Sequence, residues 1–558
     1  MKLVLQLQQG WLSLGRFAAR RVTWGLALVF CLWAAADVMV FHVSSGLALS
    51  TYDAMVRTRL SAAAPDPRLL VVDIDEASLA RMGQAFGQWP WPRDTLATVL
   101  DHIERQQPLA VVWDVMFSES DLQNPGGDAA FDAAVRQSPN SHFSVLRLPG
   151  DNDSQSKITR AVLPGLWATP ARPPDTPEIR STVALIPPAL PAVAATRLGY
   201  NNGYVDADGV LRRFRYAERL RDGSVIQSLP LSVLSVVNPI AHEAVTAGAQ
   251  VRSADGHSQG DELIAWRAQG NAYPRVAFAD VFAVAEGQPP LSPVPEFAGK
   301  VVIIGSTAPG LHDIHPTPLS PYHHGVDSLA TVLDNAINHR HLRELPRWVQ
   351  ALLACALFVG FGVWVGARGV SSLAPVTLIL PFFLLAISYL SLNFSPLFVD
   401  LHLAAGLGLL FLASLRTWNT LRRDYWCRLP ADMERQAHAA WPLVGRQAWA
   451  DAAFDRLLSA VQHHAPECRV VAGDAIAVWP AQLHWPEMAE VAAIVGPADA
   501  LAQALPALRL SLGTHLRSSG ELQPVDPAAM VPTLFEGWSK LLNSGTPVPI
   551  PSTTERPP

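Results

Sequence analysis

The sequence predicts three parts of different fold class: an α/β domain with a mixed, largely parallel sheet, an α-helical membrane bundle of four spans, and a small α/β domain near the carboxyl end. Two short apolar runs predict the first part, Leu69–Glu76 and Val301–Ala308. Both end in acidic or small residues, as buried strands of parallel sheets do. Four longer apolar runs predict the bundle, since a bilayer requires about 20 apolar residues.

The bulk composition agrees with a membrane protein that carries soluble domains. The chain has 558 residues, of which 16% are charged, and a length of this order exceeds one ordinary core. The net charge of −6 gives no reason to expect nucleic acid as a partner. The four cysteines show no zinc-binding spacing, and none lies between positions 62 and 343. We therefore expect that region to fold without disulfides, and we expect no cofactor.

Positive charges predict the orientation of the spans. The four apolar runs are residues 22–41, 348–365, 372–392 and 397–415. Arginines precede the first run, follow the second and crowd the end of the fourth, and such residues favour the cytoplasmic side. We expect residues 1–21 and 417–558 to be cytoplasmic and residues 42–343 to lie outside. A cleaved signal peptide ending near Ala34–Ala36 is an alternative for the first run, and it also exports the region that follows.

The predicted external region alternates strands and helices. A strand at Leu69–Ile74, a helix at Thr95–Ile103 and a strand at Ala110–Val115 predict a βαβ unit. Asp206–Arg213 contains an Asp-Gly pair and predicts a hairpin-like tight turn. A strand at Lys300–Gly305 closes the series.

A set of short motifs in this region resembles one known family. In chain order the motifs are Tyr52-Asp53, Val71–Leu79, Trp89–Arg93, Val112–Phe117, Asp208–Arg213, Val301–Ser306, Asp313, Thr317-Pro318, Gly325–Asp327 and Leu333–Asn335. Together they resemble the CHASE2 domain, an extracytoplasmic sensor domain of bacterial signalling receptors. The resemblance covers residues 47 to about 341 and the three-helix bundle that typically follows. It implies a periplasmic domain on a bacterial inner membrane, an undefined external ligand, a cytoplasmic signalling partner and, by analogy, a possible homodimer.

Several acidic residues are candidates for a ligand site in this domain. Asp73, Asp75 and Glu76 lie at or just past one strand end, and Asp114 ends a neighbouring strand. Ligands of open parallel sheets bind beyond the carboxyl ends of the strands. These carboxylates could hold a cation, or they could pair with Arg93 or Arg212. The alternative is a structural ion-pair network that orders the loops.

Two further groups complete the candidate set. Asp313 and Thr317 come from the later motifs, and Asp313 lies in a histidine-rich stretch that suits a transition metal or pH sensing. The stretch contains His312, His315, His323 and His324. Arg93 follows a Trp-Pro-Trp-Pro segment whose simpler role is to begin a helix. No GxSxG, HExxH or P-loop pattern is present, so we expect no catalytic residue in this domain.

The carboxyl-terminal region lacks protein-kinase motifs, but three segments resemble class III nucleotidyl cyclases. They are a helix at Ala453–Val461, a strand and turn at Arg469–Trp479, and a strand at Leu508–His515. By this resemblance Asp474 would bind a metal ion. The first metal aspartate of that family has no counterpart, and two-metal catalysis needs both carboxylates. We therefore expect residues 417–545 to form a degenerate, non-catalytic output domain. Residues 546–558, rich in Pro, Ser and Thr, are expected to be disordered.

These patterns favour an integral membrane sensor that relays an external signal to a non-catalytic cytoplasmic domain. Two alternatives remain open from the sequence. The first is a receptor-type adenylate or guanylate cyclase. The second is a membrane scaffold whose external domain binds envelope proteins.

Overall fold

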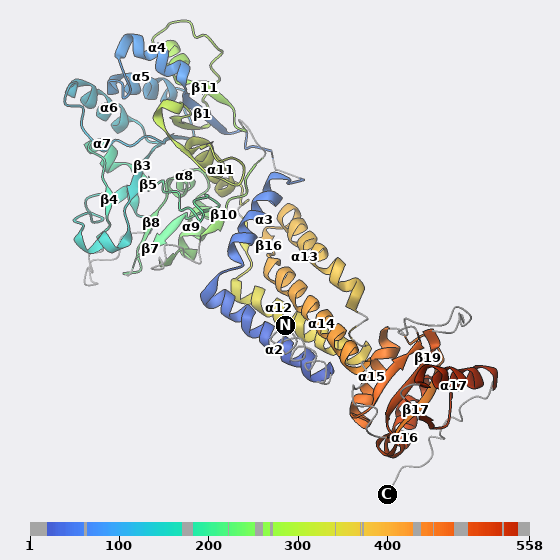
Figure 1. Cartoon of the computed structure of the whole chain (residues 1–558). Coiled ribbons are helices and arrows are strands. Elements are labelled where there is room, and N and C mark those ends of the chain that lie inside the picture. The colour runs from blue at the N-terminus through green and yellow to red at the C-terminus, as the bar shows by residue number, and fades with distance from the viewer. Residues whose placement is uncertain are drawn as a thin grey trace, which may run out of the picture. The chain divides into compact units, whose positions relative to one another are not determined.

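The computed structural model describes residues 19–60, 64–169, 182–220, 222–251, 261–267, 272–340, 342–368, 370, 373–427, 437–449, 451–473, 489–526 and 529–544. The chain divides into two compact units. One, here called the α/β unit, consists of Ser45–Leu345 and Ser388–Val399. The other consists of the described parts of Met1–Ser44, Pro346–Ile387 and Asp400–Pro558. Figure 1 shows the elements of each unit in sequence colours.

A six-stranded parallel array forms the centre of the α/β unit. Its strands lie in the order β11-β1-β12-β2-β3-β5. They are Arg275–Ala277 (β11), Leu69–Ile74 (β1), Val301–Ser306 (β12), Ala110–Trp113 (β2), Ser141–Arg147 (β3) and Arg197–Tyr200 (β5). Strand β4, Leu185–Ile186, adds to β3 in the antiparallel direction. The predicted mixed, largely parallel sheet is thus confirmed.

Helices cover both faces of this sheet, which is why its central strands are buried and mainly apolar. On one face Trp113 of β2 stacks on Phe143 of β3 with ring centroids 5.9 Å apart. Helices on that face are Glu76–Phe86 (α4), Arg93–Glu104 (α5), Pro125–Gln137 (α6), Pro191–Ala195 (α7) and Phe278–Ala285 (α10). Leu229–Val237 (α8) and Gly325–Ile337 (α11) pack against the other face.

The remaining elements of the unit are short. They are Ser45–Arg57 (α3), Pro239–Gly248 (α9), Arg213–Phe214 (β6), Ala217–Arg219 (β7), Val225–Gln227 (β8), Gln250–Val251 (β9), Glu262–Leu263 (β10), Ile314–His315 (β13), His323–His324 (β14), Arg343–Glu344 (β15) and Leu397–Phe398 (β16). Strand β6 pairs with β10, β13 with β14, and β15 with β16.

The predicted βαβ unit is present, and the predicted hairpin is present only in part. The backbone N–H of Gly209 donates to the carbonyl of Asp206 at 2.9 Å, and Gly209 has a φ of +81°, a conformation that glycine adopts without strain. The chain therefore turns where Asp-Gly predicted. It does not return along the preceding segment, because β6 finds its partner in β10.

The second unit begins with a helical bundle. Its helices are Ala19–Ala36 (α2), continued by a π-helix at Asp37–Phe41 (η2), Arg347–Arg368 (α12), Ala374–Phe394 (α13) and His402–Cys427 (α14). Helices α2, α12 and α14 meet through the rings of Phe30, Phe358 and Phe411, whose centroids lie 5.3–5.7 Å apart. Aromatic packing of this kind fixes the helices against one another.

Three helices among the described residues are long and apolar enough to cross a membrane: Arg21–Phe41, Arg347–Gly366 and Pro375–Phe394. They correspond to the first three predicted spans. The fourth prediction, residues 397–415, differs at its start, since Leu397–Phe398 is a strand and α14 begins only at His402. Whether α14 crosses the membrane stays a prediction.

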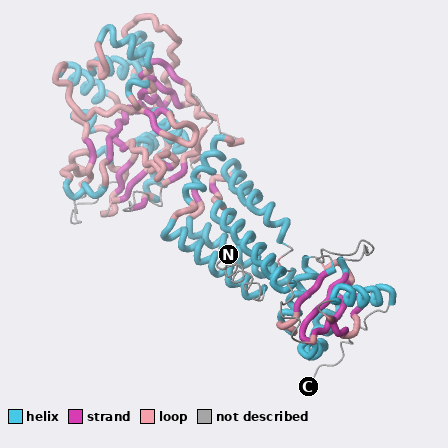
Figure 2. Tube along the Cα trace, in the orientation of Figure 1, coloured by secondary structure: helices cyan, strands magenta, loops and turns pink. Residues whose placement is uncertain are grey.

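A five-stranded antiparallel sheet forms the carboxyl-terminal domain. The strands lie in the order β18-β19-β17-β20, with β21 also on β17. The elements are His438–Gly445 (β17), Asp451–His464 (α15), Arg469–Ala472 (β18), Val491–Pro497 (β19), Ala498–Leu512 (α16), Leu516–Ser519 (β20), Gln523–Val525 (β21) and Met530–Ser544 (α17). Figure 2 shows helices on either side of these strands. Within the described residues the chain order β-α-β-β-α-β with antiparallel neighbours is the ferredoxin-like arrangement.

One prediction for this domain was wrong. Leu508–Leu512 is the last part of helix α16 and not a strand. The reason is packing: Leu501, Leu508 and Leu512 are buried at helical spacing on the sheet, and that period outweighs local strand propensity. The predicted helix at Ala453–Val461 is confirmed within α15. Asp474 and residues 546–558 lie outside the described residues.

Candidate functional site at the carboxyl edge of the sheet

Strands β1, β12 and β2 end side by side, and their polar residues gather at that edge. Asp73 of β1 accepts hydrogen bonds from the backbone N–H and hydroxyl of Thr307 at 3.0 and 2.9 Å. It also pairs with Nη1 of Arg275 at 3.0 Å, and Nη2 of the same guanidinium reaches Asp327 at 2.7 Å. The Asp73 carboxylate is thus fully partnered, as in the structural ion-pair network that the sequence left open.

The next two acidic candidates have local roles. Asp75 is the N-cap of α4, and its Oδ1 accepts from the backbone N–H of Ser78 at 2.7 Å. An acidic cap satisfies one of the free donors at a helix start. Glu76 is the first residue of α4 and is exposed. Neither side chain makes a described contact with Arg93 or Arg212, the predicted partners.

Asp114 is the acidic candidate that remains under-satisfied. Its Oδ1 accepts from Nδ2 of Asn201 at 2.7 Å, whereas its Oδ2 is buried and has no hydrogen-bond partner among the described residues. Burial, together with the nearby charge of Asp313, raises the pKa of Asp114 to about 7. A buried carboxyl group without a cationic partner favours its neutral form in this way.

Asp313 approaches the same place from the loop before β13. The residue is exposed as a whole, but its carboxyl group packs on Gly325 at the start of α11, where an added Cβ would lie 2.3 Å from Oδ1. Burial of that carboxyl group raises its pKa, and nearby His324 opposes the rise. The backbone N–H of Gly325 donates to the Asp313 carbonyl at 3.0 Å. Glycine at position 325 therefore leaves the space that the Asp313 carboxylate occupies.

The histidines of the same stretch do not form a metal site. His315 contacts the hydroxyl of Ser328 through Nε2 at 2.9 Å, and burial lowers the pKa of His315 to about 4. The His323 ring lies edge-on to Trp266 with centroids 5.4 Å apart. In the part of the chain that the structure describes, no three His, Cys, Asp or Glu side chains gather as metal ligands.

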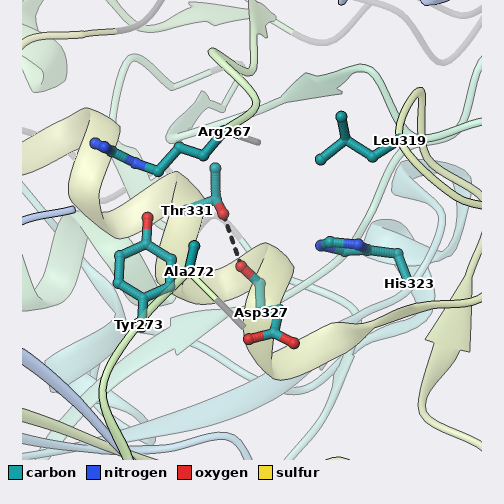
Figure 3. A pocket seen from close by; sticks show the side chains of 7 residues that line it. All are labelled: Arg267, Ala272, Tyr273, Leu319, His323, Asp327 and Thr331. Atoms are coloured by element: carbon teal, nitrogen blue, oxygen red, sulfur yellow. Dashed lines mark hydrogen bonds between the residues drawn. The ribbon is translucent and has the colours of Figure 1, made fainter. Parts of the chain in front are cut away.

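A small cavity lies beside the antiparallel pair of strands β13 and β14. It has a volume of about 10 Å³, room for roughly one water molecule. Figure 3 shows its lining: Arg267, Ala272, Tyr273, Leu319, His323, Asp327 and Thr331. The Thr331 hydroxyl donates to the carbonyl of Asp327 at 2.8 Å. Nε2 of His323 is buried and lacks a hydrogen-bond partner among the described residues. The cavity is too small for an organic ligand.

Arg93 lies at another place. It begins α5, its Nη1 pairs with Asp128 of α6 at 2.5 Å, and its guanidinium lies 5.7 Å from the ring centroid of Phe117. It also donates to the carbonyl of Glu119. These contacts join α5 to α6. The prediction that Arg93 pairs with the sheet-edge carboxylates is wrong, because the start of α5 finds its acidic partner on the adjacent helix.

Arg212 is buried in a separate ion-pair cluster, which we call the junction. It pairs with Asp53 of α3 at 2.7 Å, with Asp206 at 3.0 Å and with Asp208 at 2.7 Å. Arg213 next to it pairs with Glu344 of β15 at 2.7 Å. The prediction that Arg212 could pair with the sheet-edge carboxylates is wrong. Three carboxylates compensate its buried charge.

The junction also contains Thr317 and the segment around it. The Thr317 hydroxyl donates to the carbonyl of Ser320 at 3.2 Å, closing a tight turn. The adjacent Pro318 carbonyl accepts from Nε of Arg57, the last residue of α3, at 2.7 Å. Thr317 thus shapes the backbone that holds α3.

A scan of family models matches the CHASE2 domain to residues 25–365, which is more than half of the chain. The chain belongs to the CHASE2 domain family. Searches of the curated proteins and of the solved structures found no match. With three apolar candidate spans, this membership indicates a membrane sensor.

The CHASE2 match begins within the first candidate span and ends within the second. It therefore includes both the sheet edge and the junction. Nothing in the comparisons supports a cyclase-like module after residue 365. Several of the CHASE2 motifs lie at the sheet edge or at the junction, whereas the Trp89–Arg93 motif lies at the start of α5.

Two partners in this CHASE2 domain escaped sequence reasoning. Arg275 follows a proline in a short segment with no motif, and only the pairing of β11 with β1 brings it to Asp73. Asn201 follows β5, two strands from β2 in the sheet. Asp53 was part of the first motif, but its partner Arg212 lies 159 positions away in the sequence.

Proposed function

We propose that this chain is an integral membrane sensor whose CHASE2 domain receives an extracytoplasmic signal and passes it through the junction to the membrane helices and the carboxyl-terminal domain. The observation that most directly supports this proposal is the set of ion pairs in the junction. Its arginines tie the turn at Asp206–Gly209 to α3, which directly follows the first candidate span, and to β15, which ends three residues before α12 begins.

A second contact set supports the same role. Tyr52 of α3 packs on Phe398 of β16 with centroids 5.3 Å apart, and the backbone N–H of Leu60 donates to Asn393 at 2.8 Å. Strand β16 follows α13 and precedes α14. Segments leading to or from every helix of the bundle therefore meet in one cluster of the α/β unit. A shift in the domain would bias all of them together.

The direction of α14 supports four spans and a cytoplasmic carboxyl-terminal domain. Strands β15 and β16 pair in parallel, and each leads into a helix, α12 and α14. Within the bundle Phe361 of α12 stacks on Phe411 of α14 at 6.0 Å. The number of residues between the paired positions of β15 and β16 is nearly the same as the number between Phe361 and Phe411. Parallel helices in register would cross in the same direction, from outside to inside.

Helix α14 would transmit the signal from the bundle to the carboxyl-terminal domain. Its Trp418 belongs to the bundle core, whereas its Trp426 is buried in the core of the carboxyl-terminal domain. Between them Arg422 is fully buried and donates to the hydroxyl of Ser459 on α15 at 3.0 Å. One continuous helix thus enters both cores, so its displacement would move α15.

The experiment weakens the junction by substitution and measures hydrogen exchange in α14 and α15. The full chain in lipid nanodiscs would be studied by hydrogen exchange, wild type against Glu344→Gln and Arg213→Gln. Either variant should change protection against hydrogen exchange in the carboxyl-terminal part of α14 and in α15. Arg136→Gln, which removes an exposed guanidinium that pairs with Asp132, is the matched control and should leave those helices unchanged. Changes confined to the α/β unit in both junction variants would contradict the proposal.

A further inference from the structure

The carboxyl end of the first candidate span is a π-helical turn. Helix α2 continues into η2, and His42 ends the helix in the left-handed conformation, with a φ of +52°. The backbone N–H of His42 donates to the carbonyl of Asp37 at 2.8 Å. Helix α3 begins after a short turn, at Ser45. The helical path is therefore interrupted between Phe41 and Ser45.

The buried carboxylate of Asp37 serves this interruption. Its Oδ1 accepts from the backbone N–H groups of Val43 and Ser44 at 2.9 and 3.4 Å, and its Oδ2 accepts from the Ser44 hydroxyl. Backbone donors that are released where a helix breaks need acceptors wherever water cannot reach them. Asp37 supplies such an acceptor from within the chain.

The side chains around the turn are apolar and exposed. Met39, Val40, Phe41 and Val43 are each at least 65% exposed, and Leu47 in the first turn of α3 is 69% exposed. From position 38 to position 52 the sequence contains no Asp, Glu, Lys or Arg. The exposed apolar surface of the first candidate span thus continues past the helix break without a charged residue.

Bilayer lipid is the occupant of this surface that the observations favour. Soluble proteins rarely expose contiguous apolar patches of large area, and this patch continues a helix that is long and apolar enough to cross a membrane. The hydrogen bonds of Asp37 point the same way. In water the free N–H groups of a helix break can bind solvent, whereas in lipid they need a partner in the chain.

We propose that residues 38–47 are inserted into lipid at the membrane surface, and that Asp37 permits this by accepting from the backbone of the turn. The lipid contact would then extend past the predicted end of the first span, at residue 41, into the first turn of α3. Asp53 lies on the same helix, about 9 Å farther along its axis than Leu47. The junction would therefore lie next to the lipid surface. The lipid contact itself does not depend on whether the junction transmits a signal.

The first test maps lipid contacts of the native full chain. The chain would be placed in nanodiscs of palmitoyl-oleoyl phosphatidylcholine that contain a phosphatidylcholine with a photoactivatable diazirine in its acyl chain. After illumination, peptides that cover residues 38–47 should carry lipid adducts, as peptides of α13 should. The peptide around Leu122, a leucine of the α/β unit that is 91% exposed, should carry none. Adducts on α13 without adducts on residues 38–47 would overturn the proposal.

The second test measures access of water to the same residues. Val43→Cys, Leu47→Cys and Leu122→Cys would be reacted in these nanodiscs with a membrane-impermeant maleimide, and labelling would be followed peptide by peptide. A thiol reacts as its thiolate, which lipid disfavours, so the first two variants should react at least about 10-fold more slowly than the third. Equal rates would contradict insertion. Slow labelling without lipid adducts would show that a second copy of the chain covers the patch, and it would exclude the proposal as well.

A third comparison tests the role of Asp37. In Asp37→Ala the N–H groups of Val43 and Ser44 lose their acceptor, so the turn should move toward water and the labelling of Val43→Cys should rise several-fold. Ser44→Ala removes only the hydroxyl bond and should give a smaller rise. Ser50→Ala is the matched control, because the Ser50 hydroxyl donates to the carbonyl of Gly46 within α3 at 3.0 Å, and it should leave labelling unchanged. Unchanged labelling in Asp37→Ala would refute the role of Asp37.

Discussion

Arg212 and Asp53 form a bidentate ion pair across 159 positions of the sequence, with Nε to Oδ1 at 2.8 Å and Nη2 to Oδ2 at 2.7 Å. Bidentate pairs fix orientation as well as distance. Asp53 lies on α3, directly after the first candidate span, and Arg212 lies between the Asp206–Gly209 turn and β6. The pair therefore fixes the start of the α/β unit to its interior.

Replacing Arg212 with Met should destabilise the α/β unit by about 3–5 kcal/mol, because removal of one member of a buried pair leaves the other charge uncompensated. Asp53 and Asp208 lose their arginine partner, and Asp206 keeps only Arg213. Urea titration of the purified full chain, followed by hydrogen exchange of α3 and β6 peptides, would measure the loss. The control is Arg136→Gln, because the Arg136 side chain is 62% exposed and solvent screens its pair with Asp132, so the loss of stability should be smaller. Equal effects of the two variants would refute a special role for the pair.

Gly199 of β5 is a second point at which the structure predicts a large effect. A Cβ there would lie 2.3 Å from the backbone nitrogen of Leu229, the first residue of α8. Backbone cannot yield as a side-chain tip does, so Gly199→Ala should separate β5 from α8 at a cost of about 3 kcal/mol. Faster hydrogen exchange in α8 would report it.

Gly83 in α4 supplies the comparison of opposite sign. No atom lies within 4 Å of a Cβ at that position, and alanine is favoured over glycine inside a helix by roughly 0.5–1 kcal/mol. Gly83→Ala should therefore stabilise α4 slightly. If both alanine variants behaved alike, the close approach of β5 and α8 would be wrong.

The sequence was sufficient for elements whose pattern is local. Leu69–Ile74 was predicted as a strand with its observed bounds, because both faces of a parallel strand are buried and the run is apolar except for Asp73 near its end. The helix beginning near Arg93 was predicted through proline at its start. The segment Leu508–Leu512 was predicted wrongly, since its burial period is visible only over the whole of α16.

The sites were harder to predict because their partners are distant in sequence. Asp73 and Asp114 were rightly placed at strand ends, but the difference between them depends on Arg275, which pairs with the first and not the second. Arg212 was grouped with the sheet edge although Asp53 holds it elsewhere. The sequence shows which residues are charged and how they are spaced. Only topology shows which opposite charge reaches it.

The carboxyl-terminal domain is expected to make no cyclic nucleotide. Cells expressing the full chain would be assayed for cyclic AMP and cyclic GMP, with Asp474→Ala as the paired variant. No product in either strain is the expected result, because two-metal transfer requires two carboxylates and the sequence supplies one candidate. Product that disappears in Asp474→Ala would establish a receptor cyclase and overturn the proposal of a non-catalytic output domain.

The number of spans decides on which side of the membrane the carboxyl-terminal domain lies. If only the three apolar helices cross, the chain after Phe394 ends on the same side as the CHASE2 domain. If α14 also crosses, the domain joins the amino terminus in the cytoplasm. We expect the second result, because α14 packs in the bundle through Phe411 and carries Arg416, Arg422 and Arg423 toward its end, the charge pattern of a cytoplasmic exit.

Reporter fusions would measure this directly. Alkaline phosphatase, active only outside, and green fluorescent protein, fluorescent only inside, would be fused after Ser395 and after Ser544. The expected pattern is phosphatase activity at Ser395 and fluorescence at Ser544. Phosphatase activity at both positions would leave α14 outside the membrane. It would also place α14 and the carboxyl-terminal domain beside the sensor, and the relay would then have no cytoplasmic end.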